Sequence, residues 1–281
     1  TYEKMLLHLE SRRILRDLEK RNPSAQLGFF GIISSFKEEE APYVFSSNLK
    51  ALKGKKFQVG SIIKPVIYSL ILREGDLSKL ISAEPIKLSL KSGDWSPRDA
   101  GKQRSGQVEI KYALQKSLNI PLIRLASDYG FERLETELLP YFPSLKKPLG
   151  EFPAQLLGAI ELSPFEVVRM YKLFFADLCS SKNNKEELFE ALSHPDITTT
   201  SRRIGHLKGA TFFGKTGTSN NSYDNWYLFF DGQAIAVVWF GHTGAKNVGP
   251  LKISGSSSSF EVLKGFLTGR GKRIGSVYCQ E

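Results

Sequence analysis

Residues 210–240 read ATFFGKTGTSNNSYDNWYLFFDGQAIAVVWF, and this stretch is the strongest indication of the fold. It holds three β-rich runs, at residues 210–214, 225–230 and 234–240, separated by linkers rich in serine, asparagine, aspartate and glycine. Short β-rich runs joined by turn residues are typical of consecutive antiparallel strands. The stretch therefore predicts part of an antiparallel sheet in the C-terminal half of the chain.

The remaining sequence predicts strands near the N-terminal end and helices in between. Residues 1–21 read as an amphipathic helix that ends at Asn22-Pro23, with an apolar stripe of Tyr2, Met5, Leu6, Leu9, Ile14 and Leu18. The other expected elements are strands at 27–36 and 43–45, a mostly helical region at 61–172 with loops at 91–107 and 140–153, a short edge at 251–253, and a closing helix at 260–267 capped by the serines of 256–259. Strands at both ends with helices between them indicate an α+β domain.

Ser61 and Lys64 open an apolar segment, Ser-Ile-Ile-Lys-Pro-Val-Ile-Tyr-Ser-Leu-Ile-Leu, which predicts a largely buried helix. Proline is tolerated only in the first turn of a helix, so Pro65 places Ser61 at or next to the helix start. Residues three apart share a helix face, and we therefore expect the Lys64 amine beside the Ser61 hydroxyl. Other serines stand three residues before a lysine, but none of them opens an apolar helix; they are Ser34, Ser47 and Ser144.

Two further motifs follow, Ser117-Leu-Asn119 and Lys215-Thr-Gly-Thr218. Each motif alone is common by chance, so only their order and their settings give them weight. The Lys215 motif, the third along the chain, directly follows the first strand-like run of the predicted sheet. Gly214 and Gly217 would let a ligand backbone approach the edge of that strand.

These groups could together carry out acyl transfer. A serine hydroxyl becomes a good nucleophile when a base removes its proton, and a lysine can be that base if desolvation and a nearby cation keep it neutral near pH 7. The helix start adds positive potential near Ser61. We expect Ser117 to relay a proton between Lys64 and the leaving amine, and Asn119 to hold a substrate amide through its donor and acceptor.

The third motif supplies groups for binding and charge stabilisation. Lys215 adds a second cation, and the hydroxyls of Thr216 and Thr218 suit a carboxylate. A backbone N–H on this strand, paired with that of Ser61, would form an oxyanion hole, in which one donor is typically worth about 10²–10³ in rate.

Size and charge exclude some function classes. The chain has 281 residues, of which 41% are hydrophobic, and this suits one large domain or two closely joined lobes. The net charge is +10, but the basic runs at 53–56 and 146–147 lack interleaved aromatic residues, which argues against nucleic-acid binding. We expect a solvated basic surface that is attracted to anionic polymers or lipids.

The two cysteines, Cys179 and Cys279, are too few for a disulfide framework. We expect Cys179 to be a buried structural thiol, since it follows an apolar helical run. Cys279 is expected in a frayed C-terminal tail.

With its three motifs in order, the chain resembles the transpeptidase domain of penicillin-binding proteins, most of all the class A bifunctional type. The likeness covers about residues 20–268 and is carried by segments 22–28, 60–68, 113–125, 157–167, 214–226, 238–241 and 255–260. It implies a β-lactamase/transpeptidase-like α+β fold: an antiparallel sheet flanked by helices, a helical lobe, and the site at their junction. The implied organisation is an N-terminal helix or linker at 1–21 packed on the domain, a penicillin-binding transpeptidase domain at 22–270, and a tail at 271–281.

The resemblance also implies a reaction, that of a peptidoglycan D,D-transpeptidase. Ser61 would attack the D-Ala-D-Ala amide of a stem peptide, release D-alanine, and pass the acyl group to an amine of a neighbouring stem peptide. β-Lactams would acylate Ser61 as substrate mimics, and no metal or organic cofactor would be needed. The implied catalytic residues are Ser61, Lys64, Ser117, Asn119 and Lys215, and the implied substrate-binding residues are Thr216, Gly217 and Thr218.

Class A proteins carry a glycosyltransferase domain and a membrane anchor upstream, and neither is visible in this sequence. The chain begins with Thr and shows no signal peptide and no apolar run near the roughly 18 residues of a membrane helix, so we expect an excised ectodomain or a proteolytic core. The full protein is then expected to be membrane-anchored, on the extracytoplasmic face of the bacterial cytoplasmic membrane.

Three alternatives share the same motifs. A β-lactamase of the class A type would carry a Glu-x-x-Leu-Asn segment between the second and third motifs, and none of the glutamates there begins that pattern. A D,D-carboxypeptidase would use water in place of the amine. A β-lactam sensor would keep all three motifs and only become acylated.

Overall fold

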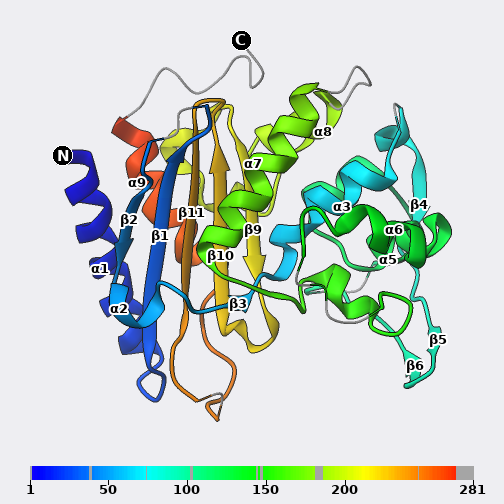
Figure 1. Cartoon of the computed structure of the whole chain (residues 1–281), viewed down its shortest axis with the longest axis horizontal. Coiled ribbons are helices and arrows are strands. Elements are labelled where there is room, and N and C mark those ends of the chain that lie inside the picture. Colours follow the sequence, from blue (N-terminus) through cyan, green and yellow to red (C-terminus); the bar gives the residue numbers. More distant parts are fainter. Residues whose placement is uncertain are drawn as a thin grey trace.

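The computed structural model describes residues 2–37, 40–73, 75–101, 104–143, 145, 148–180, 186–245 and 247–269. Its centre is a five-stranded antiparallel sheet in the order β2-β1-β11-β10-β9 (Figure 1). The strands are β1 (Leu27–Ser35), β2 (Tyr43–Ser46), β9 (Phe213–Thr218), β10 (Asp224–Phe230) and β11 (Ala234–His242). The predicted α+β class is confirmed, and the sheet joins the two ends of the chain.

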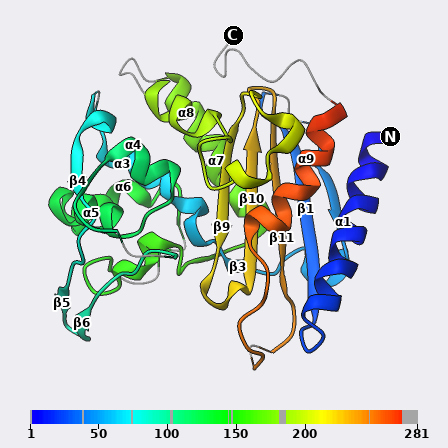
Figure 2. The same ribbon diagram turned by 180° about the vertical axis from the view of Figure 1, so that it is seen from behind.

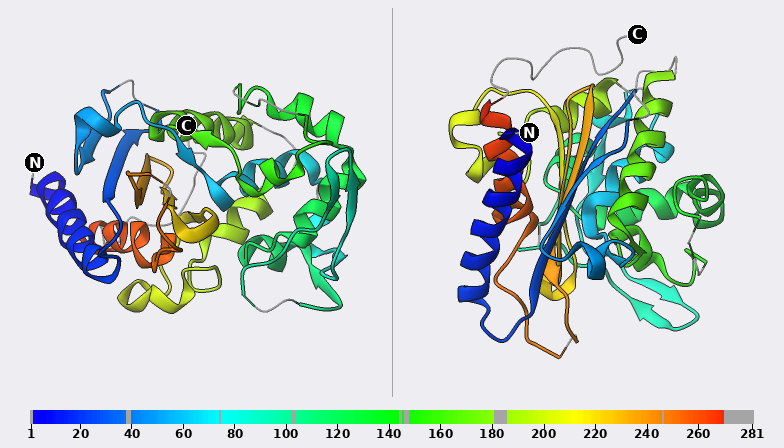
Figure 3. Two further views of the ribbon diagram at one scale, coloured as in Figure 1. Left: turned by 90° about the horizontal axis from the view of Figure 1, so that it is seen from below. Right: turned by 60° about the vertical axis from the view of Figure 1, so that its left-hand side comes forward.

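Both faces of the sheet are buried, because the central strands carry consecutive apolar residues whose side chains point alternately to the two faces. In β11, Val237 and Trp239 belong to one hydrophobic cluster, while Val238 and Phe240 belong to the other. Helices α1 (Tyr2–Arg21) and α9 (Ser259–Gly269) cover one face, and α7 (Pro164–Ser180) covers the opposite face (Figures 2 and 3). The apolar side chains on each face of the central strands therefore pack against one of the two hydrophobic clusters.

A helical lobe lies beside β9, at the edge of the sheet (Figure 1). It contains α3 (Lys64–Ile71), α4 (Ile110–Gln115), α5 (Ile120–Tyr129) and α6 (Phe131–Leu138). The remaining elements are α2 (Leu49–Leu52), α8 (Glu186–Ser193), the 3₁₀ turns η1 (Gly60–Ile63), η2 (Asp76–Ser78), η3 (Pro153–Leu157), η4 (Ser201–Arg203), η5 (Gly205–Leu207), η6 (Asn220–Ser222) and η7 (Gly255–Ser257), and the strand pairs β3 (Phe57–Gln58) with β8 (Glu161–Leu162), β4 (Leu80–Ser82) with β7 (Gln107–Glu109), and β5 (Leu88–Leu90) with β6 (Gly93–Trp95).

The first helix has the predicted bounds, but it buries a different stripe. Its buried apolar residues are Leu7, Ile14, Leu15 and Leu18. Of the predicted apolar stripe, Ile14 and Leu18 are buried, whereas Tyr2, Met5, Leu6 and Leu9 are exposed. The stripe runs through Ser11, whose polarity hid it in the sequence; the Ser11 hydroxyl donates to Leu7 O at 2.7 Å and is thereby satisfied inside the interface.

The predicted strand at 251–253 is wrong, because this segment pairs with no strand in the structure. Leu251 and Ile253 are buried in the cluster beneath α9. Leu251 N donates to Asn221 O at 2.8 Å, which fixes the segment as an irregular connection.

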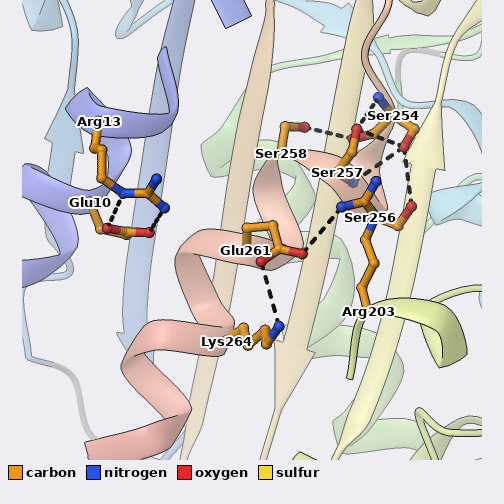
Figure 4. A network of polar contacts seen from close by, with 9 residues as sticks. All are labelled: Glu10, Arg13, Arg203, Ser254, Ser256, Ser257, Ser258, Glu261 and Lys264. Carbon is orange, nitrogen blue, oxygen red and sulfur yellow. Dashed lines mark hydrogen bonds and ion pairs between the residues drawn. The ribbon is translucent and has the colours of Figure 1, made fainter. Parts of the chain in front are cut away.

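A polar network holds α9 in place (Figure 4). Ser254 and Ser257 form a capping box at η7: Ser257 N donates to Ser254 Oγ at 3.2 Å, and Ser254 N donates to Ser257 Oγ at 2.9 Å. Glu261 lies 3.6 Å from Arg203 and 3.7 Å from Lys264. Such partly exposed ion pairs contribute about 0–1 kcal/mol each. This capping box belongs to η7, the turn that precedes α9, whereas the sequence predicted that the 256–259 serines cap the helix itself.

Cys179, near the end of α7, is half-buried and disulfide-bonded, which corrects the expectation of an unpaired thiol. The other cysteine, Cys279, falls outside the described residues, as do the predicted tail at 271–281 and the basic pair at 146–147. Over the described ranges, no helix combines the length and the apolar character that crossing a membrane requires.

Candidate active site

Ser61 lies in η1, immediately before α3, and is half-buried. Pro65 occupies the first turn of α3, so the predicted position of Ser61 at the helix start is confirmed. Bonds from outside the helix hold this segment in place. Trp226 Nε1 donates to Gln58 O at 2.8 Å, and the Tyr171 hydroxyl donates to Ile62 O at 2.6 Å.

Glycines allow the backbones of η1 and β9 to touch. Gly60 has φ +53°, and a Cβ at this position would lie 2.6 Å from Thr218 O. A Cβ on Gly217 would lie 2.5 Å from Val59 O. Both distances are shorter than real Cβ contacts, so any side chain here would push the turn away from the strand. Ser61 therefore sits at the junction of the helical lobe and the sheet.

Lys64 is completely buried, and its ammonium group faces the second motif. Its Nζ donates to Ser117 O at 2.6 Å, to Leu118 O at 3.0 Å and to Asn119 Oδ1 at 2.6 Å. Burial lowers the pKa of Lys64 to about 7, and the carboxylate of Asp99 opposes this effect. In the described part of the chain, no hydrogen bond joins Lys64 to Ser61, so the expected pairing is not seen in this arrangement.

Ser117 occupies a left-handed backbone conformation at the end of α4, with φ +58°. Leu118 N donates to Ala113 O at 2.9 Å, and Ser117 N donates to Leu114 O at 3.0 Å. These two bonds form a Schellman motif, in which glycine usually occupies the left-handed position. The turn places the carbonyl oxygens of Ser117 and Leu118 at the Lys64 ammonium.

Lys215 reaches the same serine from β9. Its Nζ donates to Ser117 Oγ at 2.9 Å and to Thr216 O at 2.9 Å. Burial, together with the positive charge of Lys64, holds the pKa of Lys215 well below its ordinary value. Ser117 thus contacts both lysines, Lys64 through its carbonyl and Lys215 through its hydroxyl.

Asn119 uses both ends of its side-chain amide within the protein. Its Oδ1 accepts from Lys64, and its Nδ2 donates to Arg98 O. The sequence predicted a free donor and acceptor for a substrate amide. Since an amide nitrogen carries two hydrogens, one N–H remains for that task.

The threonines of the third motif also have partners. The hydroxyl of Thr216 lies 2.8 Å from that of Thr199, and Gly255 N donates to Thr218 Oγ1 at 3.2 Å. Thr199 is exposed and precedes η4. A carboxylate bound here would have to share or replace these contacts.

Sequence reasoning missed Asp99 and Thr199. Neither residue belongs to a motif, and Asp99 lies in a segment that reads only as a loop. Lys116 Nζ donates to Ile197 O at 2.6 Å and connects the segment of Thr199 to the helical lobe. Over the described ranges, no group of three or more histidine, cysteine, aspartate or glutamate side chains could hold a metal ion.

No protein-family model matches the chain. Among curated proteins, penicillin-binding protein 1B of Haemophilus influenzae is 29% identical over 252 residues, which cover 78% of this chain and 32% of the relative. Penicillin-binding protein 1B of Escherichia coli is 26% identical over 258 residues, which cover 79% and 30%. The chain thus spans about a third of the length of these relatives.

Solved structures share the fold. Penicillin-binding protein 1A from Haemophilus influenzae aligns with a TM-score of 0.73 at 20% identity over 89% of this chain and 49% of that one. PonA1 from Mycobacterium tuberculosis aligns with a TM-score of 0.69 at 15% identity over 97% and 84%. A structure described as a peptidoglycan glycosyltransferase from Burkholderia ambifaria aligns with a TM-score of 0.66 at 14% identity over 96% and 97%. Sequence relatives and fold together identify the chain as a homologue of the class A penicillin-binding proteins.

Proposed function

We propose that this chain is a serine D,D-transpeptidase that cross-links peptidoglycan, with Ser61 as the nucleophile. The observation that carries the proposal is the convergence of Lys64 and Lys215 on Ser117, at a buried junction beside Ser61. Burying two lysines beside one serine costs stability, and groups held at such a cost are concentrated at functional sites.

Acylation would begin with Lys64 as a neutral amine. It takes the proton of Ser61 Oγ, and this oxygen attacks the carbonyl carbon of the terminal D-Ala-D-Ala amide. The C–N bond of the tetrahedral intermediate then breaks, and the leaving amine of D-alanine takes up, through the Ser117 hydroxyl, the proton that Lys64 took from Ser61. The acyl group remains on Ser61 until an amine of a neighbouring stem peptide accepts it.

For this first step, Lys64 must give up one of its present contacts. Its three acceptors use all three N–H donors of an ammonium group. A neutral amine has one lone pair and two donors, so loss of a proton leaves the lone pair facing one of these acceptors, and the side chain must turn to aim it at Ser61 Oγ. The lowered pKa of Lys64 makes this change available near pH 7.

The substrate would bind along β9. This strand is last in the sheet order, and within the described residues β10 is its only partner. An extended peptide can add to such an edge through main-chain hydrogen bonds. Lys215, Thr216 and Thr218 would receive the terminal carboxylate, and a β-lactam would occupy the same place as a substrate mimic.

The wider setting is proposed from the relatives. Class A penicillin-binding proteins join a glycosyltransferase to a transpeptidase, so residues 22–270 would be the transpeptidase part and 1–21 the helix that precedes it. The whole protein would be anchored in the cytoplasmic membrane and face the cell wall.

A second candidate is glycosyl transfer, because the Burkholderia ambifaria structure is described as a peptidoglycan glycosyltransferase. At 14% identity this likeness concerns the fold alone. The cluster offers amine and hydroxyl groups, which suit a serine acyl-enzyme; enzymes that cleave glycosidic bonds typically use a pair of carboxylates, and the hydrogen bonds among the described residues of this cluster involve one carboxylate, that of Asp99.

Intact mass after exposure to penicillin tests the proposal. We expect one adduct that persists for hours, is absent in Ser61→Ala, and is present in Ser89→Ala, which removes an exposed hydroxyl on β5. Rapid return to the unmodified mass would favour a β-lactamase. No adduct, combined with polymerisation of a lipid-linked disaccharide, would replace the proposal by glycosyl transfer. Stem peptides with and without an acceptor amine then separate a transpeptidase from a carboxypeptidase and from a sensor.

A further inference from the structure

Asp99 joins the loop after β6 to the start of α5. Its Oδ1 accepts from the backbone N–H of Asn119 and from that of Ile120, the latter at 3.2 Å. Asn119 is the N-cap residue of α5, but its own side chain makes no capping bond. Asp99 therefore supplies, from a distant segment, the acceptor that a helix start requires, and its negative charge suits that end of the helix.

The same loop sets the orientation of the Asn119 side chain. Arg98 O, next to Asp99, accepts from Asn119 Nδ2. With the nitrogen end fixed in this way, the oxygen end faces Lys64 Nζ at 2.6 Å. The backbone of Asn119 and its side chain are thus both held by two consecutive residues of one loop.

We propose that Asp99 is a positioning residue for the reaction with two effects on Lys64: by holding the first N–H groups of α5 it aims the Asn119 oxygen at Lys64, and its negative charge favours the protonated amine. The inference rests on the proposed function. A carboxylate that served only as a helix cap would stabilise α5 and leave the chemistry at Lys64 unchanged.

A second observation links Asp99 to Lys64 directly. The carboxylate raises the pKa of Lys64 against the larger effect of burial. Asp99 Oδ2 is buried and has no hydrogen-bond partner within the described residues, so its charge is poorly screened. Lys215 on β9 brings a second ionisable amine to this site, where burial and the charge of Lys64 lower its pKa, and on α3 burial together with Asp99 raises the pKa of Tyr68.

Two substitutions separate the roles of Asp99. Asp99→Asn keeps an oxygen acceptor for the two N–H groups and removes the charge, whereas Asp99→Ala removes both. Asp94→Asn is the matched control, since Asp94 is an exposed carboxylate on β6 that pairs with Lys87 and Ser89. The measurement is the rate of acylation by a fluorescent penicillin between pH 5.5 and 9, with thermal unfolding recorded for each protein.

We expect Asp99→Ala to lose at least tenfold in acylation rate at pH 8 while it remains folded. Asp99→Asn should keep its acylation rate at high pH within about threefold of the parent. The acylation rate falls as the pH is lowered, and the midpoint of this fall should shift to lower pH in Asp99→Asn. Asp94→Asn should match the parent in both respects. If Asp99→Ala does not fold, the midpoint of Asp99→Asn still decides.

An unchanged midpoint in Asp99→Asn overturns the inference, and so does a parental rate in folded Asp99→Ala. A parent protein that penicillin does not acylate would instead overturn the proposed function itself, and the inference with it. Acylation of the parent protein therefore tests the proposed function, and the Asp99 variants test the role of Asp99.

Discussion

Ser117 combines a strained backbone with two contacts to lysines. Its φ of +58° belongs to a region where a residue with a Cβ is disfavoured by roughly 1–2 kcal/mol. Glycine would remove that strain, but it could not offer a hydroxyl to Lys215. A serine at this position thus lowers local stability but places a hydroxyl group at Lys215.

The pair Ser117→Ala and Ser117→Gly tests this trade. Both variants lose the hydroxyl, so both should acylate more slowly by a similar factor. Ser117→Gly should be about 1 kcal/mol more stable than Ser117→Ala, because only glycine relaxes the left-handed turn. Denaturant unfolding measures the difference, and equal stabilities would show that the turn carries no such cost.

Lys64 makes the reaction dependent on pH. Burial lowers its pKa to about 7, so the amine is protonated at lower pH and cannot accept the Ser61 proton. The acylation rate should fall about tenfold per pH unit below that value and level off above it. Lys64→Ala should be acylated more slowly by orders of magnitude at every pH, and its rate should no longer fall as the pH is lowered through 7. A flat profile in the parent would exclude Lys64 as the base.

The same shift affects stability with a definite sign. In the unfolded chain Lys64 titrates near its ordinary value of 10.5, whereas in the folded protein it titrates near 7. Between these values the unfolded state binds more protons, so the contribution of Lys64 to the free energy of unfolding rises with pH. Below pH 7 both states are protonated, and the contribution no longer changes.

At the scale of elements, the sequence predicted the helices and strands in which an apolar pattern extends over many residues. The strands β10 and β11 and the helices α1 and α9 follow from such patterns. The strands β4 to β7 have three residues each, which is too short for a periodicity to show; β4 and β5 lie where the sequence predicted a mostly helical region, and that part of the prediction is wrong. Leu251 and Ile253 show the reverse case, a strand that was predicted and does not form. Their spacing is that of a strand, but they are buried beneath α9, and in the described residues they pair with no strand.

The candidate site was predictable in its motifs and only partly in its contacts. Lys64, Ser117, Asn119 and Lys215 come together as the motifs suggested. The contact of Asp99 with α5 joins residues 20 or more positions apart through an irregular loop, and no local pattern encodes it. The roles assigned to these residues stay predictions until they are tested by acylation.

At the scale of the whole molecule, the helical lobe and the sheet meet through backbone packed on backbone. A Cβ on Gly158 would lie 2.1 Å from Gly60 O, and one on Gly255 would lie 2.3 Å from Trp226 O. Gly60 and Gly217 form the junction itself, while Gly158 packs on Gly60 and Gly255 packs on Trp226 and Gly217, so the backbones on both sides are also closely packed. Because η1 is part of this junction, the position of Ser61 depends on the close packing there.

Gly60→Ala tests how far the site depends on this junction. The new methyl group would meet the Thr218 backbone at 2.6 Å and also strain a left-handed residue. Gly75→Ala is the control, since Gly75 has φ +76° but no neighbour within 4 Å. The control should lose roughly 1–2 kcal/mol of unfolding free energy and keep its acylation rate. Gly60→Ala should lose a further ~2 kcal/mol from overpacking and at least tenfold in acylation rate, because Ser61 moves away from β9. Equal losses in the two variants would mean that the lobe can shift on the sheet without disturbing Ser61.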